Sequence, residues 1–454
     1  MTAVTAPALA GTTTRTTRNR SLPAWPVAGI LLLYPLWWAL GLGVLIFPLM
    51  AVPMLVLLLR RRSAGRPVLL PPGFAWWLVF LAAAVVSIAA LGVDPPGTVA
   101  EHARERLLAV GYKLAMYLSL TVLLIYAGNL TEAELSRRRM VRLLAGMFVL
   151  TVAGGLLGMV AGDFEFTSPV EWLLPGSVRN KGFVRSLVHP YAAQIMDLVG
   201  GEKPRPAAPW GYTNTWGNNF CLLVPWLLVA AWWSRGAGRK LLAVLCLAVA
   251  VVPAVASLNR GLWIGVGLLV AYVAFRYVLA GRLWILLLLP LLGTALALAL
   301  ALTPLGDTVS ARMDNGKSNG VRSFLIEKAL DGFSGSPVIG YGGTRNTLGG
   351  RNSITVGESA GCERCGNFTV GGNGQLWQLL YAHGAAGTAG YLGFLGYGLW
   401  RFRRDRSPVG VAASGAIVTS FSAMLWYNSL VTPLAFMFLA YALLWRNWIE
   451  GKTS

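Results

Sequence analysis

The sequence has little charge for its length. Only 12% of its 454 residues are Asp, Glu, Lys or Arg, while 56% are hydrophobic. Soluble domains carry about 25% charged residues. Several apolar runs extend for the roughly 20 residues that a helix needs to cross a bilayer. These features exclude an ordinary soluble protein and predict an all-α integral membrane protein.

Side chains suited to metal binding are scarce. The chain has 18 acidic residues, four cysteines and three histidines. No cluster of Asp, Glu or His has the spacing of metal ligands, and we expect neither a metal nor another cofactor. Cys221 and Cys246 lie in apolar runs and are expected to be inert. Cys362 and Cys365 form a single Cys-x-x-Cys pair, which is weak evidence for zinc and favours a local disulfide outside the cytoplasm.

The strongly positive net charge has a membrane explanation. A charge of +20 would indicate nucleic acid in a soluble protein. Cytoplasmic loops of membrane proteins are enriched in Lys and Arg, however, so we expect no nucleic-acid partner. Placing both termini in the cytoplasm puts most basic clusters there as well. These clusters lie at 15–20, 60–66, 137–142, 235–240, 276–282, 401–406 and 446–452.

The apolar runs predict about twelve transmembrane helices. The run at 26–59 is too long for one helix and divides at 40–43 into two. The first residues lack the apolar stretch of a cleaved signal peptide and are expected to form a disordered cytoplasmic tail. The predicted division is a tail at 1–24, helices one to five at 25–161, a loop at 162–217, helices six to nine at 218–303, a loop at 304–383, helices ten to twelve at 384–445 and a tail at 446–454.

The two long loops, 162–217 and 304–383, fall on the extracytoplasmic side in this orientation. Long loops on one face usually carry function. Any chemistry is therefore expected outside the cytoplasm, where ATP and nucleotide sugars are not direct substrates. A lipid-linked substrate fits better.

Arg260 is the strongest single candidate for a site residue. It lies between two apolar runs with almost no loop, where an arginine is costly unless it is solvated or paired. One interpretation is a side chain that reaches toward the interface. The other is an anion contact, because the guanidinium fork matches phosphate oxygens.

Further basic residues occur in both long loops. Arg322 lies in the first turn of an expected amphipathic helix that ends at Gly332 and Pro337, and on composition alone it is a solvated helix charge. In the first loop, Arg205 precedes Asn214 and the next apolar run. The residues Arg179, Lys181, Arg185 and His189 recur there at helical spacing, which fits either an interfacial helix or an ordinary surface loop.

The other two histidines have structural interpretations. His102 lies in a short loop beside Glu101 and Arg104. His383 lies at the start of an apolar run, where a buried structural histidine is as good an explanation as a catalytic base.

Four patterns, in this order, resemble the O-antigen ligase/polymerase superfamily of bacterial membrane glycan-assembly proteins. They are Arg205 with Gly211, Asn214 and Gly217; Ser257-Leu258-Asn259-Arg260-Gly261; Arg322 through Pro337 and Gly340; and Asn373-Gly374-Gln375-Leu376-Trp377 through Gly384 and Gly387. The resemblance covers the whole expected topology.

The resemblance implies glycosyl transfer without a metal on the outer face of the bacterial cytoplasmic membrane. The donor is a polyprenyl-pyrophosphate-linked glycan, the acceptor is a glycan or a lipid, and membrane lipids surround the protein. Arg260 and Arg322 match the arginines that hold the pyrophosphate, and Arg205 is a third candidate. The resemblance is also compatible with a protein partner that sets chain length or takes part in assembly.

One position departs from the family. Its ligases carry a His-Asn pair where this chain has Asn373 and Gly374, and asparagine cannot accept a proton at neutral pH. His383 lies ten residues later, roughly 15 Å along a helix. The carboxylates in the same region are Glu327, Asp331 and Glu358.

Other functions remain open on the sequence. Twelve helices also suit a transporter or flippase of a lipid-linked or anionic solute, although no inverted repeat or midplane charge is evident. A different polyprenyl-phosphate-sugar transferase is expected to carry acids in its first external loop, and 40–43 has none. A membrane scaffold would leave the long loops without a purpose.

Overall fold

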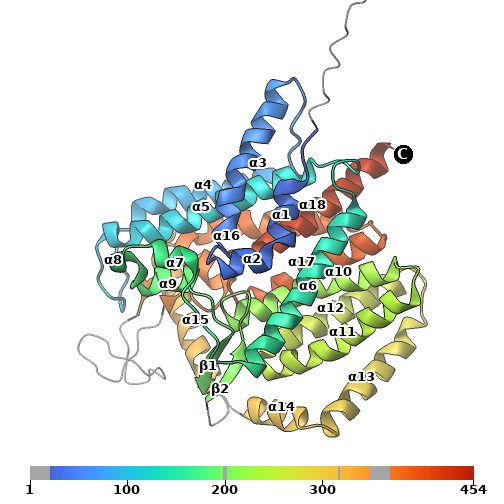
Figure 1. Cartoon of the computed structure of the whole chain (residues 1–454). Helices are drawn as coiled ribbons and strands as arrows, with labels where there is room; N and C mark the ends of the chain where they lie inside the picture. Colours follow the sequence, from blue (N-terminus) through green and yellow to red (C-terminus); the bar gives the residue numbers. More distant parts are fainter. Residues whose placement is uncertain (1–20, 198–201, 315–316, 348–368, 454) are drawn as a thin grey trace, which may run out of the picture.

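The computed structural model describes residues 21–197, 202–314, 317–347 and 369–453 (Figure 1). These residues are mostly helical, with two small antiparallel sheets. Helices occupy the apolar runs of the sequence. Their bounds are α1 (Trp25–Leu32), α2 (Tyr34–Ala39), α3 (Ile46–Ser63), α4 (Phe74–Val86), α5 (Ala103–Gly128), α6 (Arg137–Val160), α10 (Thr213–Trp232), α11 (Ala237–Ala256), α12 (Arg260–Val278), α13 (Ile285–Ala301), α16 (Gln375–Arg401), α17 (Pro408–Ala423) and α18 (Thr432–Thr453).

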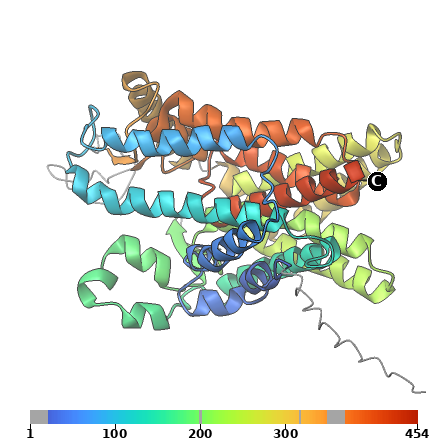
Figure 2. The same ribbon diagram turned by 90° about the horizontal axis from the view of Figure 1, so that it is seen from above.

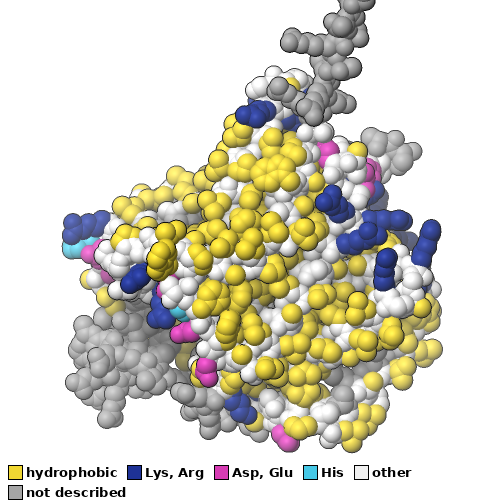
Figure 3. Space-filling view, in the orientation of Figure 1, with side chains coloured by type: hydrophobic (Ala, Val, Ile, Leu, Met, Phe, Trp, Pro, Cys, Tyr) yellow, Lys and Arg dark blue, Asp and Glu magenta, His cyan; other side chains and the backbone are white. Residues whose placement is uncertain are grey.

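The fold is all-α, and its helices have the apolar character of a membrane protein. Within the described ranges, α5, α6, α11 and α12 are long and apolar enough to cross a membrane. Shorter apolar helices occupy Phe74–Ala90, Ile285–Ala295 and Pro408–Ala423. Figure 3 shows hydrophobic side chains over most of one face, with Lys and Arg mainly near its margins. The total of twelve spans stays a prediction.

The first apolar run divides at 40–43, as predicted, but the part before this division forms two short helices and not one. The chain turns at 40–43, with Gly41 in the left-handed region at φ +79°. The part before this turn consists of α1, with eight residues, and α2, with six. The break between them follows from Pro35, which lacks an N–H and would clash with the preceding helical turn.

Helix α18 lies at the centre of the bundle. Every residue from Leu434 to Trp445 is buried, as expected for a helix that is apolar on all sides. It packs against α5, α10 and α17. A second packed region joins α4 to α16, where the backbone approach is close enough that a Cβ on Gly390 would lie 2.5 Å from the Phe80 nitrogen.

Both ends of the described chain lie at the same end of the bundle, which we call the terminal end. The Leu22 N–H donates to the Glu134 carboxylate, and Arg137 pairs with Glu450. Helix α6 runs from there to the opposite end, which we call the loop end. Figures 1 and 2 show the long bundle helices and the loop elements that gather beyond them.

The segments expected as long loops contain short elements. The first holds α7 (Pro169–Leu173), α8 (Gly176–Arg179), α9 (Gly182–Val188) and a hairpin of β1 (Ala193–Asp197) with β2 (Glu202–Pro206). The second holds α14 (Leu305–Asp314), α15 (Lys317–Gly335), β3 (Arg345–Asn346) and β4 (Thr369–Val370). Helix α16 begins at Gln375, nine residues before the expected 384, and is kinked at Gly384, where φ is +61°.

Candidate functional site: an arginine cluster at the loop end

A buried turn joins α11 to α12 at the loop end. Ser257, Leu258 and Asn259 are each at most 2% exposed. The Asn259 side chain accepts a hydrogen bond from the Leu262 N–H at 3.0 Å and caps α12, which is a role that asparagine favours. Leu258 has φ +54°, an uncommon backbone conformation for a residue other than glycine. The turn therefore makes Arg260 the first residue of α12.

The carbonyl groups of this turn hold two further arginines. The Arg205 Nε donates to the Ser257 oxygen at 2.7 Å, and the Arg312 Nε donates to the Leu258 oxygen at 3.0 Å. Both arginines are buried, with 6% and 3% of their surface exposed. Two guanidinium groups are thus fixed by neighbouring residues of one strained turn.

Four arginines lie close enough to act on one another electrostatically, and we call Arg205, Arg260, Arg312 and Arg322 the arginine cluster. Burial lowers the pKa of Arg205 to about 10; Tyr427 opposes the shift, and Arg312 and Arg322 add to it. Burial also lowers the pKa of Arg312, and Arg260 and Arg322 lower it further. Arg205 still carries its charge at neutral pH, so the site is strongly electropositive.

Tyr427 links the cluster to other elements. It lies between α17 and α18, and its hydroxyl donates to the Asn259 side-chain oxygen. The Arg322 guanidinium carbon lies 5.9 Å from the centre of the Tyr427 ring, within the range of a cation–π contact. The Tyr427 carbonyl accepts from the Gln375 N–H at 2.9 Å. Tyr427 thereby joins the α11–α12 turn to α15 and to the start of α16.

The β1–β2 hairpin positions Arg205. Gln194 pairs with Arg205 in the hairpin register, and its side-chain oxygen accepts from the Thr213 N–H at 2.8 Å. The Thr213 carbonyl accepts from the Asn259 Nδ2 at 3.2 Å. The hairpin, the first residue of α10 and the α11–α12 turn therefore form one hydrogen-bonded unit.

Two glycines of the family-like patterns are required by close packing around Asn259 and Tyr427. A Cβ on Gly217 would lie 2.4 Å from the Asn259 Nδ2. A Cβ on Gly261 would lie 2.4 Å from the Tyr427 hydroxyl. Real Cβ atoms do not approach other atoms so closely, so any larger residue displaces the turn or the tyrosine.

The structure brings together three of the residues selected from the sequence: Arg205, Arg260 and Arg322. Asn373 lies next to this cluster, because the following Gly374 N–H donates to the Asn428 side chain at 3.2 Å, beside Tyr427. Asn214 is the second residue of α10, and its side chain is exposed.

Sequence reasoning missed Arg312 and Tyr427. Arg312 lies in a polar stretch without a recognisable pattern, and Tyr427 lies in a short connection between two apolar runs. Only the fold brings them to the α11–α12 turn. The sequence offered one signal for Arg312: it is the lone arginine in the polar stretch that follows the apolar run of α13.

His383 occupies a different environment. Its Nδ1 lies 2.9 Å from the Ser87 hydroxyl, and its ring packs edge-on against Phe80 with the centroids 5.8 Å apart. Phe80 lies in the middle of α4, and Ser87 begins the short helix that follows it. None of the contacts described for His383 involves the arginine cluster, and a catalytic role for it stays a prediction.

The basic residues of the first loop form a separate exposed region. Arg179 ends α8, Lys181 precedes α9 and Arg185 lies within it. Arg179 and Arg185 line a hollow with Glu171, and Arg185 lies 3.8 Å from the Glu165 carboxylate. Their predicted role in substrate binding is independent of the arginine cluster.

The remaining candidates concern metals and cysteines. Among the described residues, no three His, Cys, Asp or Glu side chains are grouped so that they could hold a metal ion. Cys221 and Cys246 are free thiols. Cys362, Cys365 and Glu358 lie outside the described residues.

No protein-family model matches this chain, and no curated protein matches it either.

Proposed function

We propose that the protein transfers a glycan from a polyprenyl-pyrophosphate donor to an acceptor hydroxyl without a metal, as a polysaccharide polymerase or ligase. The observation that supports this proposal is the arginine cluster, in which two guanidinium groups are anchored on adjacent carbonyls and two more lie close by. Such a concentration of positive charge suits a pyrophosphate, whose oxygens match the guanidinium fork.

The chemistry requires stabilisation of the leaving group. The acceptor oxygen forms a bond to the anomeric carbon while the bond from that carbon to the pyrophosphate oxygen breaks. The pyrophosphate leaves with the electron pair, and the acceptor proton passes to a base or to solvent. Donors that are fixed before the reaction lower the barrier where negative charge develops, which is the role we assign to the arginine cluster.

No proton acceptor is assigned to this step. Asn373, next to the cluster, cannot serve as one. Glu327 and Asp331 are both exposed on α15, and Asp331 pairs with Lys328 at 2.9 Å. We propose that a good leaving group makes strong base assistance unnecessary.

The proposed site lies on the outer face of a bacterial cytoplasmic membrane. This orientation places the terminal end in the cytoplasm, as the enrichment of Lys and Arg in cytoplasmic loops favours. It leaves the loop end, with the β1–β2 hairpin, α14 and α15, to meet a lipid-linked donor and its acceptor.

The decisive test is transfer by purified protein in detergent. A fluorescent polyprenyl-pyrophosphate oligosaccharide from the native host is incubated with the protein and EDTA. Release of polyprenyl pyrophosphate with a longer or newly attached glycan is the expected result, and product size separates polymerase from ligase. An intact donor, in a preparation shown to bind it, would contradict the proposal and favour a transporter or flippase, for which a liposome flipping assay is the measurement.

A further inference from the structure

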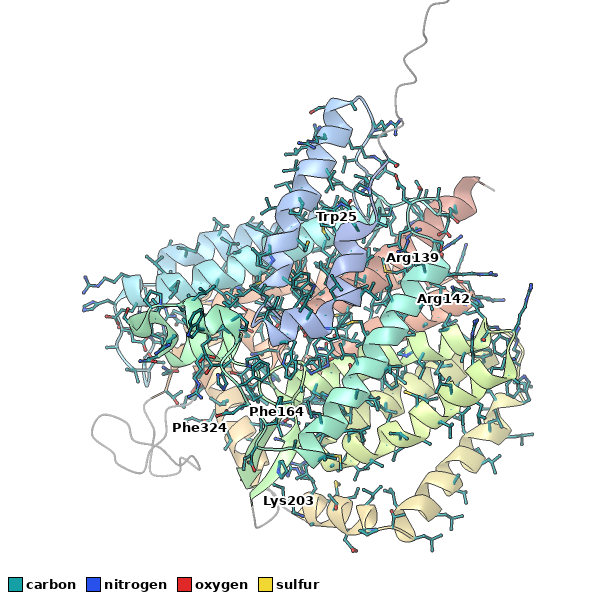
Figure 4. The ribbon with its side chains drawn as sticks, in the orientation of Figure 1. Trp25, Arg139, Arg142, Phe164, Lys203 and Phe324 are labelled. Atoms are coloured by element: carbon teal, nitrogen blue, oxygen red, sulfur yellow. The ribbon has the colours of Figure 1, made fainter. Side chains whose placement is uncertain are left out.

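A second basic site lies at the terminal end, on the outside of the bundle. A cavity of about 600 Å³ opens between α6, the end of α10 and the start of α11. Besides four arginines, its lining includes Val149, Trp233, Ser234 and Leu242. Figure 4 shows Arg142 on the terminal-end half of α6. The site has no part in the proposed transfer reaction.

The charge of this cavity has one sign. Four arginines line it from two sides: Arg138 and Arg142, one turn apart on α6, face Arg235 and Arg239 from the α10–α11 corner. Within the described ranges, these four side chains form no hydrogen bond or ion pair. No acidic residue lines the cavity. Like charges that converge in this way repel each other unless an anion lies between them.

A neighbouring cavity provides the contrast. It also lies at the terminal end, but Glu132, Asp405 and Glu450 line it together with its arginines. There Arg137 pairs with Glu132 at 2.9 Å and with Glu450. Two carboxylates thus neutralise Arg137 within the protein. Among the described residues no ion pair joins Arg138, which lines both cavities, or the other three arginines of the second basic site.

Exposed apolar side chains form the wall of the second basic site below its arginines. Val149 lies 11 residues beyond Arg138 along α6, about 16 Å deeper at helical rise, and is exposed. Leu242 is 67% exposed on α11. The buried hydroxyl oxygen of Ser234, which lies among the arginines, has no hydrogen-bond partner among the described residues. A basic rim above an exposed apolar wall matches a molecule with an anionic head and a hydrocarbon tail.

We infer that the second basic site binds the phosphate headgroup of an anionic phospholipid, whose acyl chains lie along α6 and α11. The guanidinium groups take the phosphate oxygens, and Trp233 occupies the interfacial level that tryptophan favours. The inference requires only that these helices face lipid, so it stands or fails separately from the transferase proposal.

Native mass spectrometry of the detergent-purified protein tests this inference. The probes are phosphatidylglycerol and, as a zwitterionic comparison, phosphatidylcholine. We expect the wild type to retain phosphatidylglycerol preferentially. The variant Arg142→Gln/Arg239→Gln should bind it about tenfold more weakly, because arginines close to an anionic headgroup each add appreciable attraction.

The matched control is Arg60→Gln/Arg62→Gln, which removes the same charge from exposed residues at the end of α3. This variant should bind phosphatidylglycerol like the wild type, and Arg142→Lys/Arg239→Lys should keep most of the affinity. An equal loss in both glutamine variants would show general charge attraction and overturn the inference. Competition by millimolar inorganic phosphate as effective as that by the lipid would indicate a free-anion site and also overturn it.

Discussion

At the scale of single residues, Arg260 and Arg322 are expected to be essential for transfer. Each contributes a positive charge to the arginine cluster, and loss of one preorganised donor costs about 100-fold or more in rate. Arg260→Ala and Arg322→Ala should therefore release no measurable polyprenyl pyrophosphate while remaining folded and inserted. Arg282→Ala, an exposed arginine beyond the other end of α12, is the control and should keep full activity. Normal glycan output from either cluster variant would remove these residues from the site.

Arg312 provides a sharper test, because no sequence pattern selects it. Its Nε bond to the Leu258 carbonyl orients the guanidinium, so charge and geometry can be separated. We expect Arg312→Gln to weaken pyrophosphate binding by about one to two orders of magnitude, as for other charge-assisted bonds. Arg312→Lys keeps the charge but cannot reproduce the planar fork of the guanidinium group. Its affinity for pyrophosphate should therefore lie between those of the wild type and Arg312→Gln. Isothermal titration calorimetry with pyrophosphate measures the affinities of both variants. An unaltered affinity in Arg312→Gln would exclude Arg312 as a pyrophosphate ligand.

The arginines show what sequence reasoning can reach at this scale. Arg205, Arg260 and Arg322 were predicted to act together only because they match a family pattern; composition alone made Arg322 an ordinary helix charge. Arg312 and Tyr427 reach the same turn through tertiary packing of α14 and of the α17–α18 connection. Such contacts leave no periodicity in the sequence.

At the scale of elements, the start of α12 depends on Gly261. Its replacement by alanine would place a Cβ 2.4 Å from both the Tyr427 hydroxyl and the Trp426 Nε1. We expect Gly261→Ala to lower the free energy of unfolding by about 1–3 kcal/mol, a typical cost of overpacking. Unfolding in detergent, followed by tryptophan fluorescence, measures the change.

Gly267 on the same helix is the matched control. A Cβ there meets no atom within 4 Å. Gly267→Ala should therefore raise stability by about 0.5–1 kcal/mol, because alanine has the higher helix propensity. Equal effects of the two substitutions would show that helix propensity, and not the contact with Tyr427, decides the outcome at position 261.

Apolar runs predicted the bundle helices well, because hydrophobic length is the main signal of a membrane helix. Connections and helix ends were predicted less well. The early start of α16 was missed because its first turn carries Gln375 and Gln378, two polar residues that tertiary contacts bury. The β1–β2 hairpin was missed because its short strands carry charge and proline rather than an alternating apolar pattern.

At the scale of the whole molecule, the two basic sites lie at opposite ends of the α10–α11 pair. Helix α10 runs 20 residues, from Thr213 beside the arginine cluster to Trp232 beside the second basic site. At helical rise this is roughly 30 Å, which is the thickness of a bilayer core. One site therefore reaches each membrane surface if α10 spans the bilayer, and the orientation of the molecule decides which site meets the lipid-linked donor.

Cysteine labelling in intact cells tests this orientation. Figure 4 shows Lys203 in the β1–β2 hairpin at the loop end and Arg139 near the start of α6 at the terminal end. Both residues are exposed. In a background without the four native cysteines, a membrane-impermeant maleimide should label Lys203→Cys in intact cells and Arg139→Cys only after the membrane is permeabilised. The reverse pattern would place the arginine cluster in the cytoplasm, where soluble nucleotide-linked donors occur, and would contradict transfer on the outer face even if the cluster binds pyrophosphate.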